Sequence, residues 1–369
     1  MSITAYANQF VCDLVAYEPG KPISETAREL GLEPGDIVKV ASNENPLGPS
    51  PLAKEAMRQA IEDAHIYPDG GAYALRSAIA GHHGVDLQNV IVGNGSNEII
   101  ELLCHSFLNP GTSLIAAEHA FVVYKLMATL FGAKYIEVPD PGFVHDLDAM
   151  AAAITPETRL VFIANPNNPT GTMVGDAEIG RFMAKVPDHV IVVFDEAYYE
   201  FLDTPPDTLR YLREGRNVCI LRTFSKIHGL AALRVGYGLA PAGLAGILQK
   251  ARQPFNVNAV AQAGALAALA DEDHIARTVQ TNREGLRFYE KAFTGRGVEF
   301  VPSHANFVLV RVGDGDRFFA DMLRKGVIVR AMRGYKLPEW IRISIGTAAE
   351  NQRCIEVFDE AMAATATNT

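Results

Sequence analysis

The most informative part of this sequence is a loop that reads Thr223-Phe224-Ser225-Lys226-Ile227-His228-Gly229-Leu230 and is followed by Leu233-Arg234-Val235-Gly236-Tyr237-Gly238. Two hydroxyls, a lysine and an arginine lie there between two apolar strands, which suits an anionic ligand attached covalently to an amine. A lysine with a pKa of about 10.4 is a poor nucleophile at neutral pH unless its site disfavours the ammonium form. Imine formation with an aldehyde removes that charge. A solvated surface lysine is the alternative, but Thr223, Ser225 and Arg234 beside Lys226 predict a phosphate cradle.

The same loop resembles a known family. S-K-x-x-G-L with a following L-R-x-G-Y is similar to the cofactor-lysine segment of fold-type I pyridoxal-phosphate aminotransferases. The other segments typical of that family occur in the same order over nearly the whole chain. The resemblance implies an α/β enzyme that binds pyridoxal 5'-phosphate on Lys226 and transfers amino groups.

Short apolar runs alternate with helical stretches from about residue 85 to 240. This alternation predicts a mainly parallel central sheet with helices on both faces. The expected strands are Asn89–Gly93, Ser113–Ala117, Arg159–Ala164, Val190–Phe194, Val218–Leu221 and Val235–Leu239. Several end in polar loops, where open α/β sheets usually carry their sites.

The pattern changes after about residue 250, where long helical segments predict a second, smaller α+β domain. Residues 41–250 are expected to form the large cofactor-binding domain, and residues 1–40 with 251–369 the small one. The elements expected in the small domain are helices Val260–Ala270 and Asp273–Phe293 and strands Phe307–Val312, Gly326–Arg330 and Ile341–Ile345.

Two polar segments follow apolar strands. Asp195, in Phe194-Asp195-Glu196-Ala197-Tyr198, can pair with a protonated pyridine nitrogen and keep the ring an electron sink, and Tyr198 can hydrogen-bond the ring's phenolate oxygen. A helix-capping aspartate is the alternative. Asn165-Pro166-Asn167-Asn168-Pro169-Thr170-Gly171 forms a rigid turn on any account. The resemblance makes Asn168 the second partner of the phenolate oxygen.

A glycine-rich turn, Gly93-Asn94-Gly95-Ser96-Asn97-Glu98, leads from a strand into a helix expected over 99–107. Backbone amides at a helix start bind anions. Glu98 stands where a dinucleotide fingerprint has its third glycine, which argues against that alternative. The resemblance assigns Gly95, Ser96 and Asn97 to the cofactor phosphate.

Two aromatic residues also have counterparts in the family. The resemblance makes Phe121 the ring that stacks on the pyridine, with an ordinary core phenylalanine as the alternative. It also makes Tyr67 a residue that reaches the phosphate across a subunit interface, which implies a homodimer.

The substrate prediction rests on two arginines and a tyrosine. Arg342 emerges from the strand pattern Trp340-Ile341-Arg342-Ile343-Ser344, and an arginine fork pairs well with an oxygen anion. A surface arginine is the alternative. Ala41-Ser42-Asn43-Glu44-Asn45-Pro46-Leu47-Gly48 and the I-R-I-S-I-G-T ending resemble the histidinol-phosphate aminotransferase branch. There Arg330, Arg342 and Tyr17 match the positions that bind an anionic substrate.

That resemblance implies the reaction of L-histidinol phosphate and 2-oxoglutarate to imidazole acetol phosphate and L-glutamate. Lys226 would yield the cofactor aldehyde to the amino donor and then act as the base. Three alternatives stay open: an aromatic aminotransferase, a decarboxylase similar to threonine-phosphate decarboxylase, and a regulator without activity. The chain shows no basic helix-turn-helix segment, which argues against the regulator.

Composition narrows the remaining classes. The net charge of -10 and scattered basic residues make nucleic acid a poor partner. The four cysteines lie far apart, with no Cys/His cluster at zinc spacing, so no metal is expected. The chain has no signal-peptide pattern and no apolar run long enough to span a membrane. A cytoplasmic enzyme is therefore expected.

Overall fold

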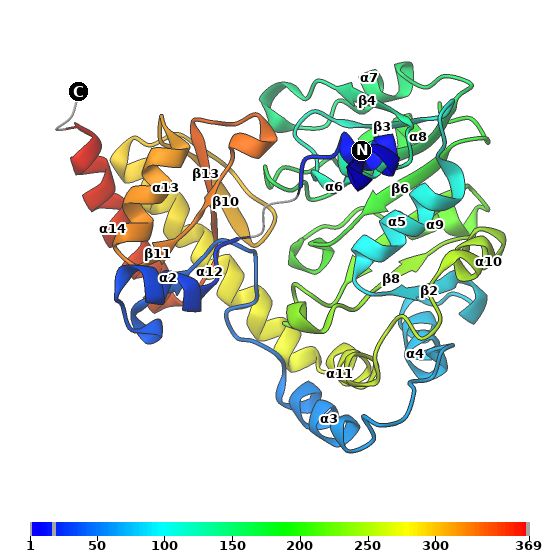
Figure 1. The fold of residues 1–369 in the computed structure, drawn as a ribbon, viewed down its shortest axis with the longest axis horizontal. Helices are drawn as coiled ribbons and strands as arrows, with labels where there is room; N and C mark the ends of the chain where they lie inside the picture. Colours follow the sequence, from blue (N-terminus) through cyan, green and yellow to red (C-terminus); the bar gives the residue numbers. More distant parts are fainter. Residues whose placement is uncertain (1, 17–19, 367–369) are drawn as a thin grey trace.

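The computed structural model describes residues 2–16 and 20–366. A large and a small β-sheet lie beside each other, with helices packed around both (Figure 1). The sequence prediction of a mainly parallel, helix-flanked sheet with a smaller α+β part is confirmed.

The large sheet has seven strands in the order β2 (Val90–Gly93), β8 (Gly236–Leu239), β7 (Val218–Thr223), β6 (Ile191–Asp195), β5 (Thr158–Ala164), β3 (Ser113–Ala117) and β4 (Lys134–Val138). Neighbouring strands from β7 to β4 run parallel, and only β8 runs against its two neighbours. All six expected strands lie in this sheet. β4 was not predicted, because Lys134 and Glu137 interrupt its short apolar pattern at the sheet edge.

Side chains alternate across this sheet with the period of two that strands impose. In β6, Val192 and Phe194 enter one core, whereas Ile191 and Val193 enter the core on the opposite face. Because both faces are buried, the central strands are largely apolar, as in other parallel sheets.

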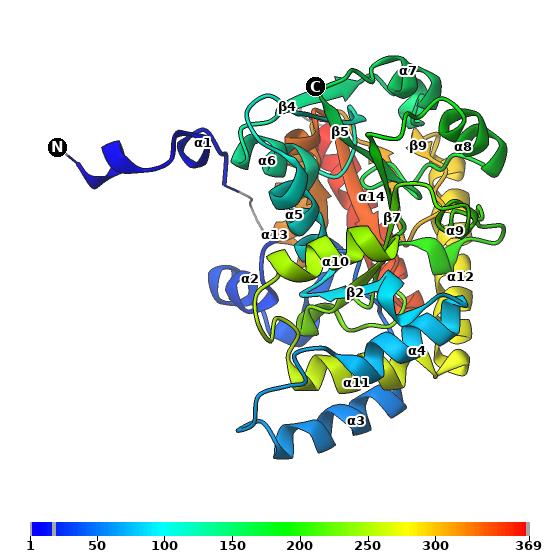
Figure 2. The same cartoon turned by 90° about the vertical axis from the view of Figure 1, so that its right-hand side faces the viewer.

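Helices cover both faces (Figure 2). One core is shared with α5 (Ser96–Phe107), α6 (Val123–Leu130) and α10 (Ala242–Ala251). The other is shared with α3 (Pro51–Glu62), α4 (Tyr73–His83), α7 (Leu147–Ala152), α8 (Asp176–Met183), α9 (Leu209–Arg213) and α11 (Ala259–Leu269).

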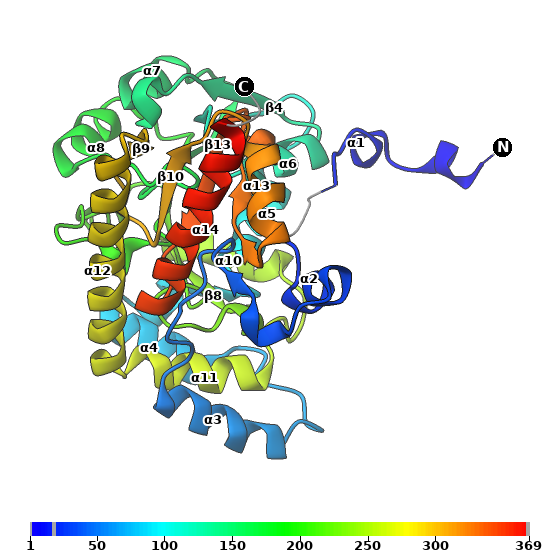
Figure 3. The ribbon, with the colours of Figure 1, turned by 90° about the vertical axis from the view of Figure 1, so that its left-hand side faces the viewer.

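The small sheet is antiparallel, in the order β12 (Arg330–Ala331), β13 (Trp340–Ser344), β10 (Phe307–Arg311) and β9 (Phe300–Val301). Its apolar core is shared with α12 (Glu272–Arg296), α13 (Gly315–Arg324) and α14 (Ala348–Ala366), which cover it in Figure 3. β1 (Val38–Lys39) pairs in parallel with β11 (Val327–Ile328).

The prediction of one strand in the small domain, Gly326–Arg330, was wrong. Residues 326–330 form no single strand; β11 and β12 divide there and join different sheets. The predicted domain limits at residues 40 and 250 stay a prediction. α11, which follows the second limit, contributes Ala261, Ala265 and Ala268 to a core of the large sheet.

The N-terminal segment extends outward in Figures 2 and 3, and its helix α1 (Gln9–Cys12) contacts α6. The next helix, α2 (Ile23–Leu30), lies beside β1 and β11. Short 3-10 helices are η1 (Ile3–Tyr6), η2 (Pro34–Asp36), η3 (Leu87–Asn89), η4 (Pro141–Phe143), η5 (Tyr199–Phe201), η6 (Ala231–Leu233) and η7 (Arg333–Tyr335). Within the described ranges, no helix combines the length and apolarity needed to cross a bilayer.

Candidate active site

A cavity of about 520 Å³ lies between the two sheets, where β5, β6 and β7 end. Twelve of the residues predicted from the sequence line it: Ser96, Asn97, Phe121, Asn168, Asp195, Tyr198, Thr223, Ser225, Lys226, Arg234, Arg330 and Arg342. The structure therefore brings together side chains that are spread over some 250 positions of the chain.

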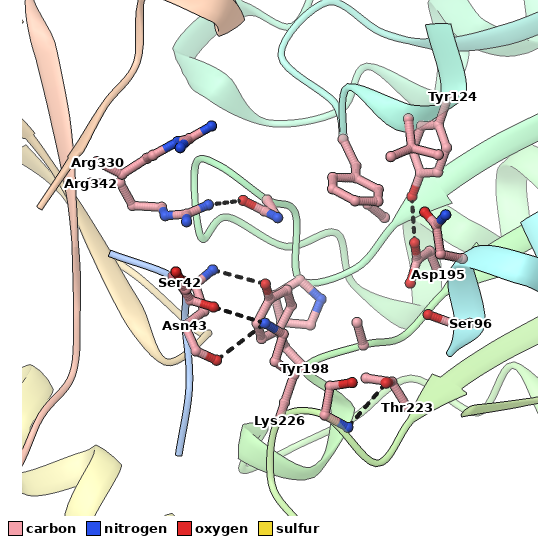
Figure 4. A pocket seen from close by; sticks show the side chains of 18 of the residues that line it. Ser42, Asn43, Ser96, Tyr124, Asp195, Tyr198, Thr223, Lys226, Arg330 and Arg342 are labelled. Carbon is pink, nitrogen blue, oxygen red and sulfur yellow. Dashed lines mark hydrogen bonds between the residues drawn. The ribbon is translucent and has the colours of Figure 1, made fainter. Parts of the chain in front are cut away.

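The Lys226 amine contacts the backbone of residues 42 and 43, which also line the cavity. Its Nζ atom donates to the backbone carbonyls of Ser42 and Asn43, each at 3.2 Å (Figure 4). Burial lowers the pKa of Lys226 to about 7, and the nearby positive charge of Arg342 adds to this effect. A lysine held in this way is available as a neutral amine near neutral pH.

Asp195 lies at the end of β6, and its two carboxylate oxygens differ in their hydrogen bonding. Oδ2 accepts a hydrogen bond of 2.7 Å from the Tyr124 hydroxyl. Oδ1 is buried and has no hydrogen-bond partner within the described part of the chain. Burial raises the pKa of Asp195 to about 6, and the bond from Tyr124 opposes that rise. The carboxylate therefore lacks a cationic donor for Oδ1.

Tyr198 and Asn168 both line the cavity, and each has a hydrogen-bond partner there. The Asn43 side-chain amide donates to the Tyr198 hydroxyl at 2.9 Å, and burial raises the pKa of Tyr198 to about 12. Asn168 Oδ1 accepts from Nη1 of Arg342, whose Nη2 donates to the Ala41 carbonyl at 2.9 Å. The predicted contacts of Tyr198 and Asn168 with a ring oxygen stay predictions.

An anion cradle forms where α5 begins. Gly95 has a φ of +79°, and a Cβ added to it would lie 2.7 Å from Nη2 of Arg234. The Ser225 amide donates to Thr223 Oγ1 at 3.1 Å, and Arg234 Nη1 lies 3.4 Å from Ser225 Oγ. Gly95 is absent from the cavity lining, but its lack of a side chain leaves room for the Arg234 guanidinium. A helix start, two hydroxyls and a guanidinium suit a phosphate.

Space is equally tight behind the lysine. A Cβ on Gly229, which has a φ of +69°, would lie 2.3 Å from the carbonyl oxygen of Gly48. The lysine loop and the 45–48 turn are therefore in backbone contact.

Two arginines mark the opposite wall. Arg330 of β12 and Arg342 of β13 are direct partners in the antiparallel register, and both line the cavity (Figure 4). Two arginines that line the same cavity suit an anionic substrate group.

Phe121 also lines the cavity, with its ring centroid 5.7 Å from that of Tyr124 in an edge-to-face arrangement. Tyr67 lies elsewhere: it is 79% exposed, stacks on Phe255 at 4.7 Å, and does not line the cavity of its own chain. Tyr17 falls outside the described residues.

Sequence reasoning missed two residues that the structure places beside the site. Asn43 lies in a stretch that was noted only as a marker of the branch, and Tyr124 looks like a core aromatic in the helix pattern. Neither carries a local sequence signal for its contact, because Tyr198 and Asp195 lie 155 and 71 positions away from them.

The cavity fits the cofactor predicted from the sequence. The buried, unpartnered oxygen of Asp195 suits a protonated ring nitrogen, the cradle around Arg234 suits a phosphate, and the amine of Lys226 suits an aldehyde. These three groups are distributed around a single cavity.

Comparison with known proteins gives the family. The sequence model of "Aminotransferase class I and II" matches residues 35–358. The chain is 62% identical over 363 residues to a histidinol-phosphate aminotransferase of Akkermansia muciniphila, covering 98% of this chain and 100% of that protein. It is 49% identical over 364 residues to histidinol-phosphate aminotransferase 2 of Ralstonia nicotianae, covering 97% of each.

A solved structure agrees with these sequence matches. The histidinol-phosphate aminotransferase of Sinorhizobium meliloti, determined in complex with pyridoxal-5'-phosphate, superposes with a TM-score of 0.87 at 27% identity and covers 96% of this chain and 97% of that one. The chain therefore belongs to the class I and II aminotransferases, within their histidinol-phosphate branch.

Proposed function

We propose that this enzyme transfers the amino group of L-histidinol phosphate to 2-oxoglutarate, giving imidazole acetol phosphate and L-glutamate in histidine biosynthesis. The observation that carries the proposal is the 62% identity to a histidinol-phosphate aminotransferase over the full length of that relative. The cavity supports it, because the chain offers both an amine of low pKa and a wall with two arginines.

We assign pyridoxal phosphate to the cavity as follows. Its phosphate would lie at Gly95, Ser96, Asn97, Thr223, Ser225 and Arg234. Asp195 would hold the ring nitrogen, Tyr198 and Asn168 the ring oxygen, Phe121 one ring face, and Lys226 the aldehyde carbon. The bound cofactor supplies an electron sink for the pair released when a bond at the substrate Cα breaks.

The chain's own residues supply proton transfer and orientation. With its pKa lowered to about 7, the free Lys226 amine is the base that we assign to the Cα proton. Arg330 and Arg342 would bind the phosphate of histidinol phosphate and the distal carboxylate of 2-oxoglutarate, so both substrates would be oriented from one wall. Tyr17 would join them at the substrate.

We further propose that the active unit is a homodimer in which Tyr67 of the partner subunit reaches the cofactor phosphate. Support comes from the exposure of Tyr67 at 79% and from its stacking on the ring of Phe255, which is itself exposed. Exposed aromatic side chains that lie together are typical of a protein interface. We place the enzyme in the cytoplasm, for which the four free cysteines are suitable.

Turnover of three candidate substrates tests the proposal. Formation of glutamate from 2-oxoglutarate should be fast with histidinol phosphate and slower with phenylalanine. Faster turnover of phenylalanine would make the chain an aromatic aminotransferase. Adding glutamate alone should bleach the visible band of the loaded enzyme. No bleaching, together with release of carbon dioxide from O-phosphothreonine, would make it a decarboxylase.

A further inference from the structure

We propose that Asn43 is a positioning residue for the reaction: its side-chain amide orients the Tyr198 hydroxyl, and its carbonyl, together with that of Ser42, orients the Lys226 amine. This inference deepens the proposed function and rests on it. Asn43 lies far from both residues in the sequence, and no cofactor role was expected for it.

Asn43 is held on all sides. It is 1% exposed. Its amide NH donates to Ser344 Oγ at 2.8 Å, and that hydroxyl donates to Asn43 Oδ1 at 2.9 Å. Its carbonyl accepts from Asn306 Nδ2 at 3.1 Å as well as from Lys226. The position of its Nδ2 group beside Tyr198 is thus fixed by the small sheet, to which Ser344 belongs.

The backbone explains why an asparagine stands here. Asn43 has a φ of +53°, in the left-handed region that glycine and asparagine tolerate best. This conformation allows two consecutive carbonyls, those of Ser42 and Asn43, to face the same amine.

The direction of each hydrogen bond has a chemical consequence. A phenol has one hydrogen and can both donate and accept. Because Tyr198 accepts from Asn43, its own hydrogen is left to be donated into the cavity, where the ring oxygen is assigned. A neutral amine that donates its two hydrogens to two carbonyls keeps its lone pair free. Lys226 is then oriented as a proton acceptor.

A variant that keeps the backbone and removes the side chain tests the inference. Asn43→Gly retains the left-handed conformation and both carbonyls but removes the donor to Tyr198. We expect kcat to fall about tenfold, as for loss of one hydrogen bond in a transition state, while KM stays within about twofold. A hydrogen bond to an anionic oxygen favours its deprotonated form, so the pH midpoint of the visible absorbance of the loaded enzyme should rise.

Tyr198→Phe and the double variant give the decisive comparison. If Asn43 acts through Tyr198, the double variant should match Tyr198→Phe in kcat and in absorbance midpoint. Additive effects, or a midpoint in Asn43→Gly equal to that of the unaltered enzyme, would overturn the inference.

Two further variants guard against a purely structural effect. Asn43→Asp keeps the shape and the acceptor for Ser344 but replaces the amide donor by an oxygen, so it should raise the midpoint as Asn43→Gly does. If Asn43→Gly does not fold, the absorbance midpoint of Asn43→Asp tests the role of the Asn43 side chain in its place. Asn351→Ala removes another buried asparagine, bonded to Gly346 and absent from the cavity lining. It should lower the melting temperature and leave the midpoint and kcat unchanged.

Failure of the proposed function is recognised separately, by the absence of turnover in the unaltered enzyme. The absorbance midpoint needs only bound cofactor. An unchanged midpoint in both Asn43 variants would therefore reject the role of Asn43 even in an enzyme with the proposed activity.

Discussion

Burial moves the pKa values of two residues in one cavity in opposite directions, because it disfavours the charged form of each. The pKa of Lys226 falls to about 7 and that of Asp195 rises to about 6. Slightly above neutral pH, the amine is therefore largely neutral while the carboxylate is largely ionised. These are the protonation states that a base and a partner of a protonated ring nitrogen require.

The lowered pKa of Lys226 predicts a pH-dependent stability. In the enzyme without cofactor, charging the buried amine destabilises the fold fully below about pH 7, and this penalty disappears as pH rises toward the unfolded value of about 10.4. Lys226→Met should therefore melt at a higher temperature than the unaltered chain at pH 7, with the difference shrinking toward pH 10. Turnover should be lost in this variant. A difference that stays constant with pH would contradict the assigned pKa.

Tyr124 should control the ionisation of Asp195. Tyr124→Phe removes the 2.7 Å bond that favours the carboxylate, so the pKa of Asp195 should rise. The acid limb of the profile of kcat/KM against pH should move to higher pH, and kcat near pH 7 should fall about tenfold. Tyr289→Phe, in the core of the small sheet, is the control and should leave the profile in place.

Most of the predicted residues that line the cavity could be picked out one by one, since Lys226, Asp195 and Asn168 lie in short segments with their own chemistry. Asn43 and Tyr124 were not, because their roles come from contacts made across the fold. A segment such as Ala41-Ser42-Asn43 gains its meaning only when β13 and the lysine loop are placed on either side of it.

At the scale of elements, the ends of β6 and β7 carry cavity residues on one side of the sheet and a buried ion pair on the other. Asp195 and Thr223 line the cavity, whereas the adjoining residues Glu196 and Arg222 form a buried ion pair, with 2.7 Å between Oε2 and Nη2. This pair joins the segments that carry Asp195 and Lys226. It lies behind the site and takes no part in the cavity lining.

Breaking that ion pair should be costly. Glu196→Gln removes the carboxylate that directly contacts the buried Arg222 guanidinium, and we expect a loss of about 3 kcal/mol in unfolding free energy, measured with urea. Adding Arg222→Met should recover part of the loss. As a control, Glu299→Gln breaks the exposed pair with Arg311 and should leave the free energy of unfolding nearly unchanged. Equal losses from both single variants would disprove the role of burial.

Substitution of the two arginines on β12 and β13 should weaken substrate binding. Arg342→Ala should raise KM for histidinol phosphate on the order of a hundredfold, as for loss of a charge-assisted contact, with a smaller effect on kcat. Arg330→Ala should act in the same direction. Since Arg342 also contacts Asn168 and Ala41, Arg342→Lys serves as the comparison that retains charge. An unchanged KM would remove Arg342 from the substrate site.

Strands and helices with strong periodicity were predictable, and short or edge elements were not. β5 and β6 are continuous apolar runs, and α12 has a long amphipathic pattern. β1, β9 and β11 have two residues each, so their pairing is set by tertiary contacts and leaves no periodic signal. The break between β11 and β12 follows from pairing with different sheets, which a linear pattern does not encode.

At the scale of the whole molecule, the proposed dimer predicts complementation between inactive variants. Tyr67→Ala should impair the active site of the partner subunit, whereas Lys226→Ala should impair the active site of the subunit that carries it. After unfolding and refolding the two variants together in equal amounts, about half of the dimers should be mixed, and each mixed dimer should contain one intact site. The mixture should therefore regain about a quarter of the activity of the unaltered enzyme. Refolding each variant alone is the control. No recovery in the presence of mixed dimers would show that Tyr67 acts within its own subunit or not at all.

The contact between Gly229 and Gly48 has a consequence for how natural variation in this enzyme is interpreted. With 2.3 Å separating a hypothetical methyl group from a main-chain oxygen, even alanine is too large for position 229. Only glycine fits at position 229 while the two loops are in contact. A survey of sequences would therefore rank this glycine with the reactive residues, although it is preserved for clearance and takes no part in chemistry.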